Sequence, residues 1–542
     1  MGILKQAAWI LWVCAYATAS ERPNIVLILA DDMGYSDLGC YGGEIDTPNL
    51  DRLGANGLRF TDFHNAARCC PTRASLLTGL YPHETGVGHM VYEDLGEGYL
   101  GHLNDRCVTL AQVLAAAGYQ TLMSGKWHVG HQMKEVLPEQ RGFAQFFGTY
   151  LHVDSYFKVL PDCDIWRNGV KQIDGSWERL PDDPKLPGRE FYTTDVYTDA
   201  AIDFIGQALK KDAPFFLYLA YNAPHWPLEA PERNLAKYRN RYHGGWDRLR
   251  EQKWRRMQEL GVIAKGTPLS PSENTPWSEV KPADREELAF RRAIYAAQVD
   301  RLDENVGRVI QFLEASGQLE NTLILFLSDN GCSAEEGMFG YGFQKNRIAN
   351  FDAWRAASGR SASQGQAWAN VSNVPFRRYK KDTYEGGSRT PLIVHWPRGV
   401  TGRGWVRTPG HITDIMPTLA EVADTFYPGD APPMRGRSLV PLFENPDEVP
   451  DSLQNRTIYW EHEGNRAIRS GDWKMVSSYE RGPGGGRHTP WELYHLADDP
   501  VELKDLAAAQ PDKVCELEAD WTTWAKDVKA LPNLFERRAA KR

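Results

Sequence analysis

The sequence predicts an α/β fold: a large, mixed and mostly parallel sheet flanked by helices, followed by a smaller α+β domain. Apolar runs of six or seven residues are typical of strands buried on both faces of a sheet, and the chain has four of them, at 24–30, 215–220, 322–327 and 391–396. Helical periodicity lies between them, most clearly where apolar residues recur at spacings of three and four from Leu288 to Leu313. Such alternation is typical of a sheet covered by helices on both faces.

Polar residues follow three of these predicted strands. Asp31 and Asp32 come directly after the first, His225 shortly after the second, and Asp329 and Asn330 after the third. Open α/β sheets bind ligands at the carboxyl ends of their strands. Neighbouring side chains in a strand face opposite ways, so an adjacent pair binds one ion only where the chain turns. Because oxygen ligands suit hard divalent cations, the two polar pairs predict a metal site.

A helix is expected to begin at Cys69, in the segment CCPTRASLLTG. Pro71 suits the first helical turn, and Gly79 suits the position just past the end. The free N–H groups and the positive dipole end near Cys69 favour thiolates and bound anions. Arg73 follows one turn later, where its side chain reaches the same site. The segment therefore predicts an anion-binding cysteine.

Length and charge limit the classes of protein to consider. A chain of 542 residues is too long for one simple core, so we expect two domains. The pattern changes near Pro441 to short alternating runs, which predicts a large α/β domain at 20–440 and a small α+β domain at 441–542. The formal net charge of −9 argues against nucleic acid as a partner.

The N-terminus is typical of a secretory signal peptide. Lys5 precedes an apolar run at 7–17, and Ala17-Thr18-Ala19 is a suitable cleavage site, so residues 1–19 are expected to direct export to the periplasm or the medium. The run is too short to cross a bilayer. No later stretch is long and apolar enough for a membrane span.

The segment at Cys69 also resembles the signature of the sulfatase family, which reads Cys-x-Pro-Ser-Arg with a downstream Thr-Gly. Thr72 stands where the family usually has serine, and both are small hydroxyl residues. Further family segments occur in family order: Asp31-Asp32, Gly125-Lys126-Trp127-His128, Ala223-Pro224-His225, and Asp329-Asn330 with Lys380. The resemblance extends over roughly residues 22–540.

This resemblance implies a fold of the alkaline phosphatase superfamily and hydrolysis of sulfate monoesters, either aryl sulfates or sulfated carbohydrates. In the family the cysteine becomes formylglycine through a formylglycine-generating enzyme. Cys69, not Cys70, holds that position, because proline and arginine must follow two and four residues later. The resemblance also implies bound Ca²⁺, held by Asp31, Asp32, Asp329, Asn330 and the formylglycine oxygen at position 69.

The resemblance assigns catalytic roles to three more side chains. Arg73 would hold the hydrated formylglycine, and His128 would take a proton from it. His225 would contact the substrate and protonate the leaving oxygen, a task that suits an imidazole with an ordinary pKa near the working pH.

Two lysines are implied to bind the sulfate oxygens. Lys126 is one of them. The other stands four residues before the aromatic residue that precedes Glu-Gly-Gly; counting back from Tyr384 gives Lys380, with Lys381 as the alternative.

Two other functions stay open at this point. Relatives with the same cysteine motif hydrolyse phosphonates or phosphodiesters, and sulfate and phosphate have similar size and geometry. A non-catalytic relative that binds sulfated glycans is the other alternative, although every carboxylate and basic residue of the motifs is present.

Overall fold

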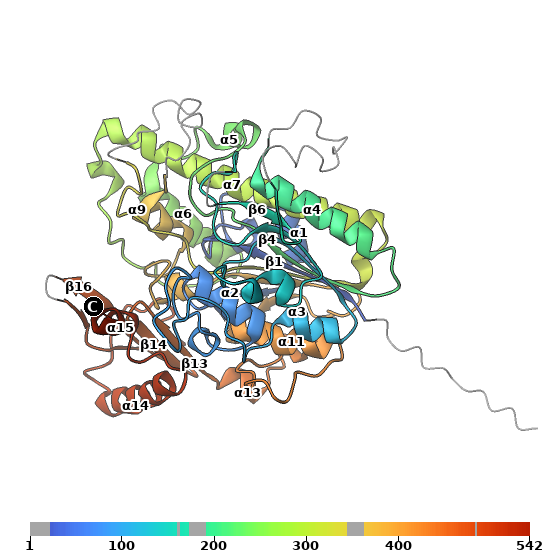
Figure 1. Ribbon diagram of the computed structural model, residues 1–542. Coiled ribbons are helices and arrows are strands. Elements are labelled where there is room, and N and C mark those ends of the chain that lie inside the picture. The colour runs from blue at the N-terminus through green and yellow to red at the C-terminus, as the bar shows by residue number, and fades with distance from the viewer. Residues whose placement is uncertain (1–21, 160–162, 173–190, 344–361, 483–484, 542) are drawn as a thin grey trace, which may run out of the picture.

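The computed structural model describes residues 22–159, 163–172, 191–343, 362–482 and 485–541. A ten-stranded sheet forms its centre, in the order β11-β2-β10-β9-β1-β8-β4-β5-β6-β7 (Figure 1). The strands are β1 (Asn24–Ala30), β2 (Leu58–Phe60), β4 (Gln120–Lys126), β5 (Gln145–Thr149), β6 (Ile165–Arg167), β7 (Val170–Gln172), β8 (Phe215–Ala220), β9 (Thr322–Ser328), β10 (Leu392–His395) and β11 (Gly404–Val406).

The middle of this sheet is parallel and its margins are mixed. Five neighbouring strands run parallel to one another, in the order β9-β1-β8-β4-β5. Strand β10 is antiparallel to both of its neighbours, β9 and β2. The predicted mixed, mostly parallel sheet is thereby confirmed. Because these central strands point the same way, the residues after β1, β8, β4 and β9 meet at one edge.

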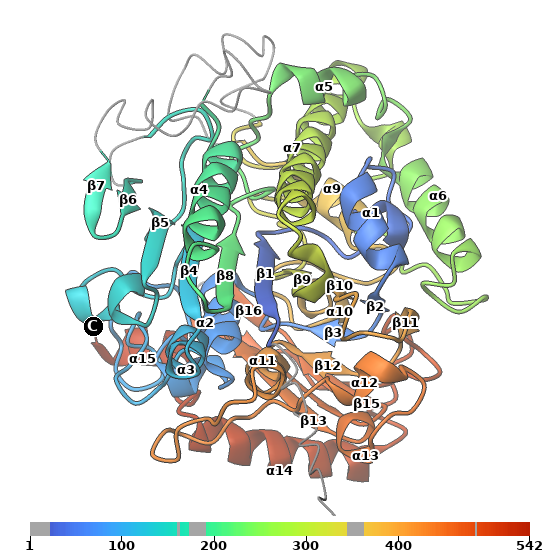
Figure 2. The same ribbon diagram turned by 90° about the vertical axis from the view of Figure 1, so that its right-hand side faces the viewer.

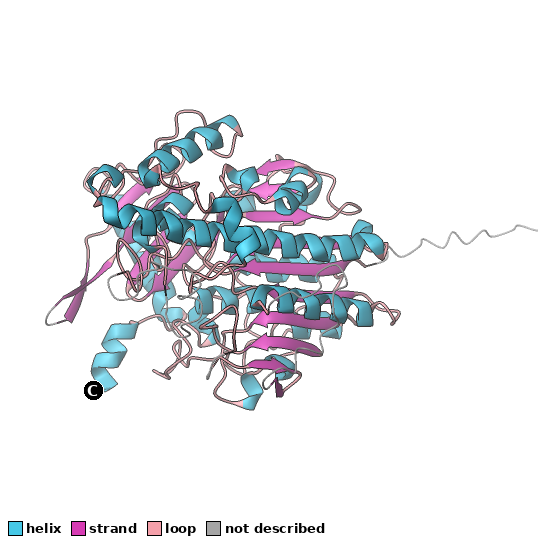
Figure 3. Ribbon diagram, turned by 90° about the horizontal axis from the view of Figure 1, so that it is seen from above, coloured by secondary structure: helices cyan, strands magenta, loops and turns pink. Residues whose placement is uncertain are grey.

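Helices cover both faces of the sheet, as predicted (Figures 1 and 3). On β1, Val26 and Ile28 face one apolar cluster and Ile25, Leu27 and Leu29 face the other. The first cluster contains side chains of α1 (Pro48–Ala55), α4 (Thr193–Ala208), α5 (Glu232–Tyr238), α6 (Gly245–Glu259), α7 (Pro282–Ala315) and α9 (Gly365–Ser372). The second contains side chains of α2 (Cys69–Thr78), α3 (Leu110–Ala116), α11 (Ile415–Val422), α12 (Pro441–Glu444) and α13 (Asp451–Gln454).

A smaller C-terminal unit packs beside the large sheet (Figure 2). Its antiparallel sheet consists of β13 (Thr457–His462), β14 (Asn465–Ser470), β15 (Trp473–Ser477) and β18 (Glu492–His495). One face of this sheet packs on α14 (Pro511–Asp527), and the other contacts Tyr384 of the large unit. The other α-helices and strands of the described residues are the hairpin β16 (Tyr479–Gly482) and β17 (Gly485–His488), the pair β3 (Phe63–His64) and β12 (Gly410–His411), α10 (Glu385–Ser388) and α15 (Leu534–Lys541).

The boundary at 440/441 stays a prediction, and the predicted signal peptide at 1–19 lies outside the described residues. Within the described ranges, every helix is too short or too polar to cross a membrane.

Candidate active site

The two predicted polar pairs come together where β1 and β9 end. Asp32 has a φ of 66°, so the chain turns there and both aspartates face the same side. The N–H of Asp32 donates to Asp329 Oδ1 at 3.2 Å, and Asn330 Nδ2 donates to Asp32 Oδ1 at 2.7 Å. A non-glycine residue in this left-handed region is strained, which is typical of functional sites. Asp31, Asp32, Asp329 and Asn330 thus form one buried carboxylate cluster.

Three cations surround the carboxylate cluster. Arg73 donates through Nη2 to Asp329 Oδ2 at 2.8 Å, and Lys126 Nζ lies 2.6 Å from Asp31 Oδ2. Lys380 Nζ lies 2.8 Å from Asp32 Oδ2. Burial opposes ionisation of Asp31, yet the charges of Lys126, His225 and Arg73 outweigh it and hold the pKa of Asp31 below its usual range.

Two oxygens of the carboxylate cluster are left without partners. Asp31 Oδ1 and Asn330 Oδ1 are buried and accept no hydrogen bond from any described residue. Leaving such an atom unsatisfied costs about 1–3 kcal/mol. A hard cation ligated by oxygen would satisfy both atoms. The residues present therefore fit Ca²⁺, as the resemblance implies.

Cys69 lies beside this cluster at the start of α2, where the sequence predicted a helix N-terminus. Its Sγ, the Cys70 Sγ and a ring nitrogen of His128 lie within 4.8 Å of one another. A hydrogen bond from the Cys70 thiol and the charge of Lys126 hold the pKa of Cys69 well below its usual value, despite burial. His128 follows β4, and burial with the nearby Lys126 charge lowers its pKa to about 3.

His225 reaches the same site from the loop after β8. Its Nε2 lies 3.5 Å from Asp32 Oδ2, and its Nδ1 lies 2.5 Å from the carbonyl oxygen of Trp226. Burial lowers the pKa of His225, while the Asp32 charge opposes that shift. The structure thus brings together every site residue that the sequence analysis named. Of the two candidate lysines, Lys380 contacts the carboxylate cluster.

Comparison with known families shows which family the chain belongs to. The family model described as Sulfatase matches residues 23–425, which is most of the chain. The chain belongs to the sulfatase family. A second model, N-sulphoglucosamine sulphohydrolase, C-terminal, matches residues 377–521 of this sulfatase.

Sulfatases of other organisms match the sequence of this sulfatase over most of its length. It is 35% identical to an arylsulfatase of Klebsiella aerogenes, over 76% of this chain and 88% of that protein. It is 34% identical to an uncharacterized sulfatase of Schizosaccharomyces pombe, covering 93% and 94% of the two chains. An N-acetylgalactosamine-6-sulfatase of Rattus norvegicus is 28% identical, covering 90% and 79%. The protein is a sulfuric ester hydrolase.

Solved structures agree on the fold. The crystal structure of Ps i-CgsB in complex with k-i-k-neocarrahexaose superposes with a TM-score of 0.65 at 25% identity, covering 93% of each chain. A structure in complex with D-glucosamine-2-N,6-O-disulfate superposes with a TM-score of 0.63 at 22% identity, covering 94% of this sulfatase and 99% of that chain, and shows the fold alone.

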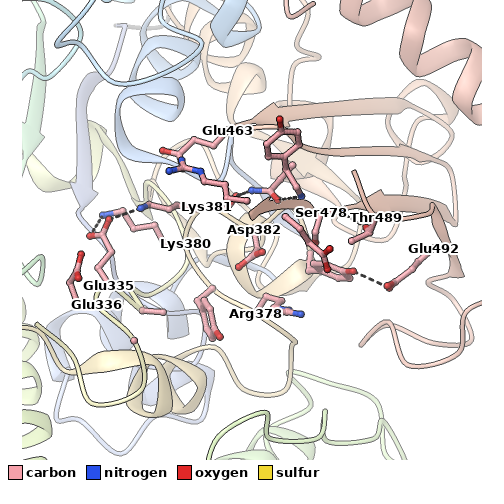
Figure 4. Close-up of a pocket in the computed structure, with 18 residues that line it drawn as sticks. Glu335, Glu336, Arg378, Lys380, Lys381, Asp382, Glu463, Ser478, Thr489 and Glu492 are labelled. Carbon is pink, nitrogen blue, oxygen red and sulfur yellow. Dashed lines mark hydrogen bonds and ion pairs between the residues drawn. The ribbon is translucent and has the colours of Figure 1, made fainter. Parts of the chain in front are cut away.

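A cavity of about 840 Å³ adjoins the site, between the large unit and the C-terminal sheet (Figure 4). Its described lining includes Glu335, Lys380, Lys381, Asp382, Glu463 and Glu492. Sequence reasoning missed Glu335, which lies in a loop with no motif of its own. The signal available was its place shortly after Asp329 and Asn330.

Proposed function

We propose that this sulfatase hydrolyses sulfate monoesters of carbohydrates and of aryl alcohols, using a formylglycine made from Cys69 and a Ca²⁺ ion. The ligands of that ion would be Asp31, Asp32, Asp329, Asn330 and the residue at position 69. The observation that carries the proposal is the pair of unpartnered buried oxygens, Asp31 Oδ1 and Asn330 Oδ1, in a cluster that adjoins Cys69.

Two absent groups would supply the chemistry that side chains alone lack. A hard cation polarises a sulfate oxygen and lowers the pKa of a bound hydroxyl. Position 69, once converted to formylglycine and hydrated, would supply that hydroxyl as the nucleophile.

The chain's own residues provide charge and proton transfer. Lys126 and Lys380 would neutralise sulfate oxygens as charge develops on the ester, a contribution that is strong in a buried site. Arg73 would hold position 69, although in this structure it also donates to Asp329 Oδ2.

His128 and His225 would move the protons. Since the pKa of His128 is lowered to about 3, its ring is neutral at ordinary pH. His128 would take a proton from the hydrate at position 69. His225 would protonate the leaving oxygen; catalysis of this kind is typically worth about 10²–10⁴-fold.

The cavity beside Lys380 supports a carbohydrate as the natural substrate class. About 840 Å³ is far more than a sulfate group requires, and side chains such as Arg378, Ser478 and Thr489 offer hydrogen bonds to hydroxyl groups. Tyr479 adds an aromatic surface in the same lining.

The decisive experiment combines mass spectrometry with turnover. Protein produced with a formylglycine-generating enzyme should carry an aldehyde at position 69 and release sulfate from an aryl sulfate. Aldehyde-bearing protein that hydrolyses phosphodiesters and no sulfate ester would refute the proposal.

We also propose that residues 1–19 direct export. Expression in a secreting host should give an exported protein whose mature N-terminus begins at residue 20. An intracellular product that retains the whole N-terminus would contradict this proposal.

A further inference from the structure

The Glu335 carboxylate lies among three cationic side chains beside the proposed sulfate site. Its Oε1 lies 2.9 Å from Arg68 Nη1 and 3.1 Å from Lys381 Nζ. Its Oε2 accepts a hydrogen bond from Trp226 Nε1 at 2.8 Å and lies 3.7 Å from Lys380 Nζ. Cations and an N–H group gathered around two oxygens are what a bound sulfate or carboxylate requires.

We propose that Arg68 and Lys381 form a second anion subsite and that Glu335 fills it, so the enzyme rejects substrates with another anionic group beside the scissile sulfate. This inference rests on the proposed function, because it takes Lys380 as a ligand of the scissile sulfate.

Lys380 joins the two sites. Its Nζ lies 2.8 Å from Asp32 Oδ2 on one side and 3.7 Å from Glu335 Oε2 on the other. Arg68 directly precedes Cys69 in the chain and is the N-cap residue of α2. An anion in the second subsite would therefore be a close neighbour of the sulfate under attack.

The second subsite opens on the substrate cavity. Glu335, Lys380 and Lys381 all line that cavity, and they lie together at one end of it (Figure 4). The side chain of Lys381 is 35% exposed, whereas that of Glu335 is 17% exposed. A substituent on the substrate can thus reach the position that the Glu335 carboxylate now holds.

Glu335 is a permanent occupant because it stays ionised. Burial opposes its ionisation, but the charges of Lys380, Arg68 and Lys381 outweigh burial and hold the pKa of Glu335 far below its usual range. A second anion has to displace this carboxylate or bind against its charge. Like charges a few ångströms apart in a partly buried site repel strongly.

The other described cationic side chains of the cavity do not form an alternative site for a second anion. Arg378 pairs with Glu273 at 3.1 Å, and Arg481 pairs with Glu463 at 3.4 Å. Each already has a carboxylate partner, so a second anion gains no unpaired cation there. The described part of the cavity therefore favours a substrate that is neutral apart from its scissile sulfate.

The test compares catechol monosulfate with catechol disulfate, which differ by one neighbouring sulfate. For the wild-type enzyme we expect kcat/KM to be lower for the disulfate. For Glu335→Gln we expect the ratio of disulfate to monosulfate kcat/KM to rise by at least about tenfold, since a like charge has been removed. Glu336→Gln is the matched control: it removes the same charge one residue along, and no described ion pair joins Glu336 to Arg68 or Lys381.

A double variant, Glu335→Gln with Lys381→Met, should lose most of the gain, because it removes one cation of the subsite. An unchanged ratio in folded Glu335→Gln would overturn the proposal. If that variant fails to fold, the wild-type comparison decides: a wild-type preference for the disulfate refutes the inference, and a preference for the monosulfate supports it.

Calorimetric binding of both esters to the Cys69→Ala protein gives the same comparison without turnover. There the expected order of affinity is monosulfate over disulfate, and the reverse order counts against the subsite. Failure of the proposed function is distinct, because it appears as no hydrolysis of the monosulfate at all.

Discussion

Replacing Lys380 by methionine should remove one of the two lysines that we propose to neutralise the sulfate. Lys380 Nζ lies 2.8 Å from Asp32 Oδ2, and both side chains are 1% exposed. Methionine keeps most of the side-chain volume but loses the charge and the hydrogen bond to Asp32 Oδ2. We expect kcat on an aryl sulfate to fall by about 10²–10³, the usual effect of removing one preorganised group that stabilises transition-state charge.

The same change should also destabilise the fold when calcium is absent. Removing one partner of a buried ion pair costs about 3–5 kcal/mol. The lower end applies here, because Asp32 keeps the hydrogen bond from Asn330 Nδ2 at 2.7 Å. Calcium should recover part of the loss, since the ion would pair with the Asp32 carboxylate.

The assay is steady-state hydrolysis of an aryl sulfate at saturating calcium, with thermal unfolding followed in calcium and in chelator. Lys381→Met is the comparison, because the sequence left both lysines open. Loss of kcat at position 380 should exceed the loss at position 381 by at least about tenfold. A larger loss at position 381, or near wild-type kcat in Lys380→Met, would refute the reasoning.

Three further predictions follow from the site and from the contact between the two units. Cys69→Ala should abolish both the aldehyde and the activity while Cys70→Ala keeps most of each; peptide mass spectrometry checks this, and an aldehyde on residue 70 would contradict it. Asp329→Ala should remove most activity and weaken calcium binding measured by calorimetry, because a hard-oxygen ligand is lost; unchanged affinity and rate would mean that the ion binds elsewhere. Burial raises the pKa of Glu502 from 4.5 to about 7, although the charge of Lys474 opposes the shift. The protonated carboxyl therefore adds to the free energy of unfolding below pH 4.5, and this contribution is lost as the pH rises through 7. Glu502→Gln should flatten this decline in thermal unfolding, and an equal decline in both proteins would count against it.

Sequence pattern predicted the elements whose burial is local and continuous. β1 and β8 have the bounds that their apolar runs indicated, because every residue of both strands is buried. Asp31, Asp32, Asp329 and Asn330 were predicted for a related reason: they follow strand ends, and parallel strands bring those ends together. The roles of the other motif residues came from the resemblance to the sulfatase family. Local pattern therefore predicted the carboxylate cluster and four of the ten strands, namely β1, β8, β9 and β10.

Contacts between distant segments were beyond the reach of local pattern. Trp246 of α6 packs against Trp368 of α9, with ring centroids 5.5 Å apart, although more than a hundred residues separate them. Glu335 was missed in the same way, because Arg68 and Lys381, the cations that define its role, come from two other segments.

The cavity beside Lys380 is lined by residues of both the large unit and the C-terminal unit. In the proposed function, residues of the large unit would act on the sulfate, and Ser478, Tyr479 and Arg481, which line the cavity in or beside the β16–β17 hairpin, would contact the rest of the substrate. A buried ion pair joins the two units: Lys474 Nζ lies 2.6 Å from Glu385 Oε1, five residues along the chain from Lys380. Exchange of the hairpin alone is thus a route to new substrate preferences on an unchanged reaction centre, for evolution and for protein engineers alike.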